Sequence, residues 1–117
     1  MSRVEIQAAL RFAEQTEYMR FVPELLCIHG SLIALRQPDD PAADQIFQRA
    51  IDLSRQQQAL YWELRAALSL AELWQMQGRQ TEAYTLLRPI HRRFTEGFAA
   101  PVLIRASALL RSIDGRV

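Results

Sequence analysis

The chain has 117 residues, of which half are apolar and 23% are charged, as expected for a globular domain. A chain of this length can bury a core without disulfides or bound metal. Its formal net charge of +1 excludes a strong global basic field for nucleic acid and the acidic excess of many disordered tails.

The single cysteine, Cys27, excludes an intrachain disulfide and fits a reducing compartment. The longest apolar stretches, such as Ala66 to Ala71, are far too short to cross a bilayer. The first residues lack the apolar segment of a signal peptide. We therefore expect a soluble, cytoplasmic protein that makes no membrane contact.

A three-residue pattern with spacings of four and then three occurs three times. Its members are Ile6, Leu10 and Ala13, then Ala43, Phe47 and Ala50, then Ala83, Leu87 and Ile90. This spacing places the members of each copy on one face of a helix. A recurrence of about 40 residues is typical of helical repeat arrays. It indicates an architecture and leaves the function open, because such arrays serve unrelated partners.

The first two helices are expected at about residues 3–15 and 18–35. Pro23 either kinks the second helix or marks its true start within the first turn. Pro38 then ends that helix, Asp40 is a good N-cap, and Pro41 suits the first helical position of the next.

The third helix is predicted to run from Pro41 to about Arg55, and the fourth to cover residues 59–77 with Gly78 as its C′ residue. Thr81 is the expected N-cap of the fifth helix, and a sixth helix is expected at 100–113. Period-two alternation is not sustained in any segment, so strands are not expected. The sequence predicts an all-α fold of about six helices in antiparallel pairs with short connections.

Two predicted helices carry matching residues at equivalent positions. They are Leu26, His29, Gly30 and Ile33 in one, and Ala67, Leu70, Ala71 and Trp74 in the other. These positions resemble the Trp, Leu, Gly and Tyr positions in helix A of the tetratricopeptide repeat. The three-residue pattern resembles its helix B. The small residue lies where two helices of a pair cross most closely.

This resemblance implies a single domain, a short right-handed solenoid, with a half repeat at 3–16, repeats at 18–55 and 59–94, and a capping helix at 100–113. His29 departs from the apolar consensus, the consensus proline after helix B is missing, and the period is longer than the usual length of about 34.

Two strings give a narrower resemblance, Trp62-Glu63-Leu64-Arg65-Ala66-Ala67 and Phe94-Thr95-Glu96-Gly97-Phe98. They are similar to the C-terminal tail of large bacterial signalling and transcriptional regulators. Those proteins join a nucleotide cyclase or winged-helix domain, an ATPase module and a tetratricopeptide tail. Because the first helix is a B helix without an A partner, we expect a fragment or truncated relative that carries only the tail.

Catalytic, cofactor-binding and metal-binding residues are not predicted. Cys27 and His29 are about 200° apart around a helix axis, so they cannot readily share a metal ion or form a nucleophile pair. His91 lies among Arg88, Arg92 and Arg93, which would repel a cation. The acidic pairs of the chain read as surface and capping residues, and a Gly-rich phosphate loop is missing.

The basic cluster near the end of the fifth predicted helix has two interpretations. Arg88 and Arg92 share an exposed face, where cations favour the helix macrodipole. The alternative is contact with an acidic partner or a phosphate group. Nucleic acid is not expected as a partner without more basic surface.

The resemblance also implies a partner-binding groove lined by the A helices. Transferred position by position, the groove takes Glu24, Cys27 and Ser31 from one helix and Arg65, Leu68, Glu72 and Gln75 from the other. This mixture suits an extended peptide or a neighbouring helix. Alternatively, the last helix or another repeat simply covers the groove.

We therefore expect a non-catalytic protein–protein interaction module, which binds a protein or peptide or couples a sensory input to an effector domain. The unpaired first helix would leave apolar surface through which a homodimer could form. The alternative function is small-molecule sensing, with an effector held in a cavity lined by Trp62, Leu68 and Trp74.

Overall fold

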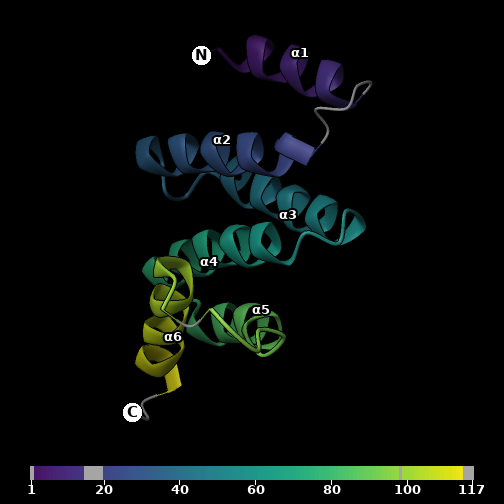
Figure 1. Ribbon diagram of the computed structural model, residues 1–117. Helices are drawn as coiled ribbons and strands as arrows, with labels where there is room; N and C mark the ends of the chain where they lie inside the picture. Colours follow the sequence, from purple (N-terminus) through teal and green to yellow (C-terminus); the bar gives the residue numbers. More distant parts are fainter. Residues whose placement is uncertain (1, 15–19, 98, 115–117) are drawn as a thin grey trace.

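The computed structural model describes residues 2–14, 20–97 and 99–114. In this part of the chain every regular element is a helix, which confirms the all-α prediction (Figure 1). The helices are α1 (Arg3–Glu14), α2 (Val22–Arg36), α3 (Pro41–Gln56), α4 (Leu60–Met76), α5 (Gln80–His91) and α6 (Pro101–Asp114).

The helices pack in chain order. Each one contacts its neighbours in the sequence, and α4 additionally contacts α2 and α6. The molecule is elongated, with extents of 44 × 32 × 19 Å, and its termini lie at opposite ends (Figure 1). As a result α4 occupies the centre, whereas α1 contacts α2 alone among the described helices.

Local sequence signals explain most helix ends. The carboxylate of Asp40 accepts a hydrogen bond from the backbone N–H of Ala42 at 2.9 Å, and Pro41 follows as the first helical residue, as predicted. Gly78, at φ +81°, follows α4 in the left-handed conformation expected of a C′ glycine. Pro23 lies in the first turn of α2, which confirms the second of its two interpretations.

Two predicted starts were wrong. The second helix begins at Val22 rather than at residue 18, because Arg20 and Phe21 form a short 3₁₀ turn; residues 15–19 lie outside the described part. In α5 the N-cap position is Arg79 rather than Thr81. The N-cap position makes no side-chain capping hydrogen bond, and the guanidinium of Arg79 instead donates to the first-turn carboxylate of Glu82 at 2.7 Å.

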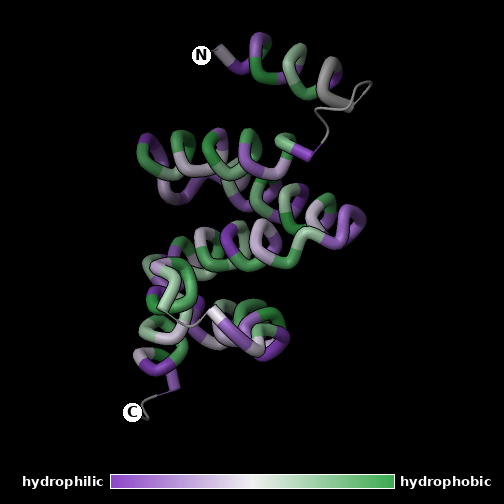
Figure 2. Tube along the Cα trace, in the orientation of Figure 1, coloured by the Kyte–Doolittle hydropathy of each residue, from purple (hydrophilic) through white to green (hydrophobic). Residues whose placement is uncertain are grey.

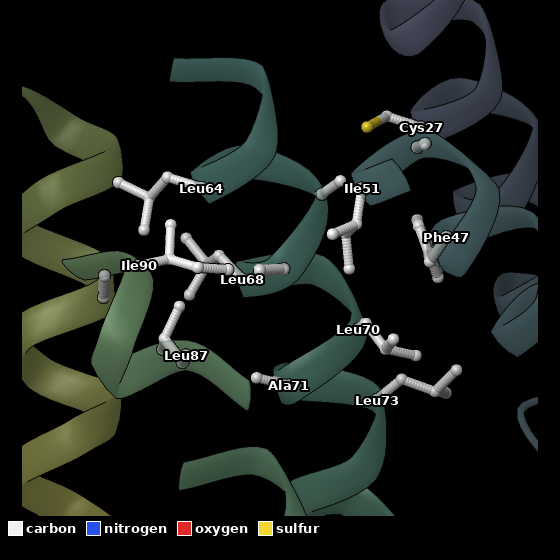
Figure 3. Close-up of a cluster of buried hydrophobic side chains, with 14 of the residues drawn as sticks. Cys27, Phe47, Ile51, Leu64, Leu68, Leu70, Ala71, Leu73, Leu87 and Ile90 are labelled. Carbon is white, nitrogen blue, oxygen red and sulfur yellow. The ribbon is translucent and has the colours of Figure 1, made fainter. Parts of the chain in front are cut away.

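The three-residue pattern lies in the core. Its described members are all buried, at Ile6, Leu10, Ala43, Phe47, Ala50, Ala83, Leu87 and Ile90, and the side chain of Ala13 lies outside the described part. Figure 3 shows α4 between two layers: Leu64 and Leu68 lie on the side of α5, and Leu70 and Leu73 on the side of α3. Burial on both sides explains why α4 is apolar around most of its circumference.

α2 is also apolar around most of its circumference, and green segments recur along its length in Figure 2. Unlike α4, it is not covered on all sides. Ile28, Leu32 and Leu35 are 52%, 47% and 81% exposed. Helix α1 is the neighbour on the outer side of α2, and it leaves this apolar row open to solvent.

Candidate functional site

A groove of about 340 Å³ lies between α2 and α4. Four of the seven residues predicted to line a partner groove do so: Glu24, Cys27 and Ser31 from α2, and Arg65 from α4. Glu24, Cys27 and Ser31 share a face of α2 because their spacing of three and four residues follows the helical period. We call this hollow the α2–α4 groove.

The structure places the other three predicted groove residues elsewhere. Leu68 is 1% exposed and belongs to the core. Glu72 accepts a hydrogen bond from Arg105 of α6 at 2.6 Å, and Gln75 donates one to Ser112 of α6 at 3.1 Å. Helix α6 therefore covers the part of the predicted groove at Glu72 and Gln75. The part at Arg65 remains open.

The transferred positions missed three residues that also line the α2–α4 groove, namely Ile28, Leu32 and Ser69. The helical period could have found them, since Ile28 and Leu32 follow Glu24 at spacings of four and eight. The groove thus has apolar residues along one wall and opposite charges, Glu24 and Arg65, on its two sides.

Cys27 lies in the groove wall but is only 5% exposed. Burial raises the pKa of its thiol to about 11, an effect that Arg65 opposes and Glu24 reinforces. The thiol is therefore protonated at neutral pH and is a poor nucleophile. Its place in the wall is that of a small packing residue.

A second hollow, of about 590 Å³, continues the groove towards the start of α2 and α4. Glu24 lines both hollows, and Phe21, Ala59 and Trp62 add apolar surface here. The ring of Trp62 also meets Tyr61 edge-on, with centroids 5.2 Å apart. The two hollows together form an open concave strip along α2 and α4.

The cavity suggested for a small-molecule effector is not assembled as expected. Trp62 lines the open hollow just described, whereas Leu68 and Trp74 are packed in the core at 1% and 7% exposure. The indole N–H of Trp74 donates to Asp44 at 2.6 Å, and the guanidinium of Arg79 lies 4.6 Å from its ring centroid. These contacts hold α3, α4 and the α4–α5 turn together.

The buried carboxylate of Glu63, at 2% exposure, serves the fold as well. It accepts hydrogen bonds from Arg55 at 2.9 Å and from Arg93 at 3.0 Å. This triad joins α3 and α4 to the segment after α5. It physically links the two strings on which the narrower resemblance rests, since Arg93 directly precedes Phe94.

Within the described residues, His, Cys, Asp and Glu side chains do not gather in groups of three or more that could hold a metal ion. Likewise, none of the described helices combines the length and apolar character needed to cross a membrane.

Comparisons with known protein families, with curated proteins and with solved structures found no match to this chain. The resemblance to tetratricopeptide tails of bacterial regulators therefore stays a prediction.

Proposed function

We propose that this chain is a non-catalytic interaction module whose α2–α4 groove binds an extended peptide or a helix of a protein partner. The observation that carries the proposal is the combination, in one open groove, of exposed apolar side chains with flanking opposite charges. Apolar contact would supply affinity, and Glu24 and Arg65 would set the orientation of the bound segment.

The helix arrangement supports a kinship with tetratricopeptide tails. Successive helices from α1 to α5 run in alternating directions, α6 lies across α4 and α5, and α2, α4 and α6 also contact in turn (Figure 1). Gly30 and Ala71, at matching positions of α2 and α4, are both buried, and a Cβ atom on Gly30 would lie against the ring of Phe47. In this proposal the regulator's tail supplies the docking surface and an upstream domain supplies the activity.

A peptide-display selection against the wild-type chain tests the groove. Selected peptides are measured by fluorescence anisotropy against Ile28→Gln, with Ile104→Gln of α6 as the matched control. The two isoleucines are 52% and 53% exposed, but only Ile28 lines the groove. We expect Ile28→Gln to weaken binding about tenfold, because this factor corresponds to the free energy gained by burying an apolar side chain. Ile104→Gln should leave the affinity unchanged. Equal affinities for both variants would reject the groove.

We also propose that the chain self-associates through the end formed by α1 and α2. Val4, near the start of α1, is 75% exposed and Leu35, near the end of α2, is 81% exposed. These two positions lie at the same end because the helices run in opposite directions (Figure 1). Sedimentation equilibrium should show a dimer that Leu35→Glu dissociates. A wild-type monomer at high concentration would contradict this.

A further inference from the structure

A separate hollow of about 580 Å³ lies between α5 and α6. It is lined by Arg88, His91, Arg92, Phe94, Ser107, Leu110 and Arg111. We call it the α5–α6 basic hollow. Three arginines line it and none of its lining residues is acidic, in contrast with the α2–α4 groove.

The arginines of this hollow differ from four others, Arg55, Arg79, Arg93 and Arg105, each of which lies within 4.0 Å of a carboxylate. Across the described residues, no such ion pair involves Arg88, Arg92 or Arg111. Within the described part of the chain, these three guanidinium groups therefore have no carboxylate within 4.0 Å.

The side chains reach the hollow from two helices at matching spacings. Arg88, His91 and Arg92 occupy one face of α5 and its C-cap, and Ser107, Leu110 and Arg111 occupy one face of α6. Both sets follow the pattern i, i+3, i+4, so the two faces converge on a common space.

Several of these groups are held in position. The guanidinium of Arg88 donates to the hydroxyl of Tyr84 and lies 5.5 Å from the centroid of its ring. The imidazole of His91 and the hydroxyl of Ser107 are hydrogen-bonded at 3.0 Å across the two helices. Such fixed donors lose less conformational entropy when they bind a ligand.

The electrostatics favour an anion. The end of α5 contributes a negative charge of about one half from its macrodipole, which three guanidinium groups outweigh. Burial, and then the positive charge of Arg88, lower the pKa of His91, so its imidazole is neutral at pH 7. The positive charge of Arg88 disfavours protonation of the His91 imidazole, and a bound anion would reduce this effect.

We propose that the α5–α6 basic hollow binds the phosphate group of a small phosphorylated molecule, with Arg88, Arg92 and Arg111 as its ligands. A guanidinium group donates two parallel hydrogen bonds to two oxygens of one phosphate group. A phosphate dianion also balances the charge of several guanidinium groups better than a single carboxylate does. Leu110 and Phe94 would contact the carbon skeleton of the ligand. The volume lies in the range of small-ligand sites, about 300–1,000 Å³.

This site is independent of the α2–α4 groove, so its test does not depend on a protein partner. Amide chemical shifts are followed by NMR while phenyl phosphate, inorganic phosphate or phenol is added. We expect shifts centred on α5 and α6, with phenyl phosphate binding more tightly than inorganic phosphate and phenol not binding. Raising the salt concentration should weaken the binding.

Arg92→Gln and Arg111→Gln should each weaken phenyl phosphate binding about tenfold, because this factor corresponds to the free energy of one charge-assisted hydrogen bond. The matched control is Arg36→Gln, which removes an exposed arginine from the last turn of α2, and it should bind as the wild type does. Thermal melts establish that the variants fold. Shifts outside α5 and α6, or equal weakening in all three variants, would overturn the site. Tighter binding of a single-stranded oligonucleotide than of phenyl phosphate would overturn its assignment to a small ligand.

Discussion

At the scale of single residues, Gly30 of α2 lies against the ring of Phe47 of α3. A Cβ atom placed on Gly30 would be 2.8 Å from Cε1 and 2.9 Å from Cζ of that ring. Phe47 is 2% exposed, so the ring has little space into which to move. The glycine therefore sets how closely α2 and α3 approach each other.

Gly30→Ala should lower the free energy of unfolding by up to about 2 kcal/mol. Overpacking costs about 1–3 kcal/mol, and the gain of about 1 kcal/mol in helix propensity offsets part of it. Urea denaturation measures the change. In a Phe47→Leu background the penalty should shrink, because the ring that obstructs the methyl group is gone. A stabilised Gly30→Ala protein would show that the ring yields freely.

Gln58, after α3, adopts a left-handed conformation with φ +56°. Glycine fills the corresponding place after α4, where Gly78 has φ +81°. Because a side chain in this conformation costs about 1 kcal/mol, Gln58→Gly should raise the free energy of unfolding by up to about 1 kcal/mol. Gly78→Gln should lower it by a similar amount in the same denaturation assay. If both substitutions proved neutral, the two turns would not carry this strain.

At the scale of elements, the Glu63 triad connects the consecutive helices α3 and α4 to the segment after α5. Glu63→Gln keeps the shape of the side chain and removes the charge that Arg55 and Arg93 contact. Loss of one partner of a buried pair costs about 3–5 kcal/mol. Because both arginines are more than half exposed, we expect a smaller loss, about 2 kcal/mol.

Glu72→Gln is the control for this prediction. Glu72 pairs with Arg105 on the surface, at side-chain exposures of 40% and 54%, and such pairs contribute about 0–1 kcal/mol. Chemical denaturation of both variants should therefore separate the contribution of a buried carboxylate from that of a surface ion pair. Equal losses would show that burial of Glu63 adds nothing.

At the scale of the whole molecule, the two histidines make stability depend on pH. Burial lowers the pKa of both, reinforced by Arg3 of α1 for His29 and by Arg88 for His91. The unfolded chain, with a histidine pKa near 6.5, therefore binds protons more readily than the folded chain. The free energy of unfolding should therefore be at its full value above about pH 7 and should decrease as the pH falls through 6.5.

Thermal melts between pH 5 and 8 would measure this dependence. A His29→Gln plus His91→Gln variant should show a flatter profile across pH 6–7, while acid unfolding at lower pH, where carboxylates titrate, should be retained. If the double variant kept the wild-type slope at pH 6–7, these histidines would not be its source.

The predictable parts of this fold depend on short-range signals. The Asp40 cap, the Gly78 end and the buried three-residue pattern all follow from residues within a few turns of each other. The fifth helix starts without a side-chain cap at Arg79, so a capping rule based on small polar residues placed its start at Thr81.

The missed parts of the candidate site depend on long-range packing. Glu72 and Gln75 are covered because α6 crosses α4, and their partners Arg105 and Ser112 are more than 30 residues away in the sequence. Similarly, Arg111 joins Arg88 and Arg92 only because α5 and α6 converge. The linear spacing of Arg88 and Arg92 indicated a basic face, but not the hollow beside it.

The attachment of α1 to one helix alone has a consequence for how the molecule opens. Exposing the amides of α4 requires loss of its contacts with α2, α3, α5 and α6, whereas those of α1 become accessible when one interface parts. Native-state hydrogen exchange should accordingly be fastest in α1 and slowest in α4. Each opening of α1 would uncover the side of α2 against which Ile6 and Leu10 are buried, so the protein would transiently enlarge the apolar face that it already presents to solvent.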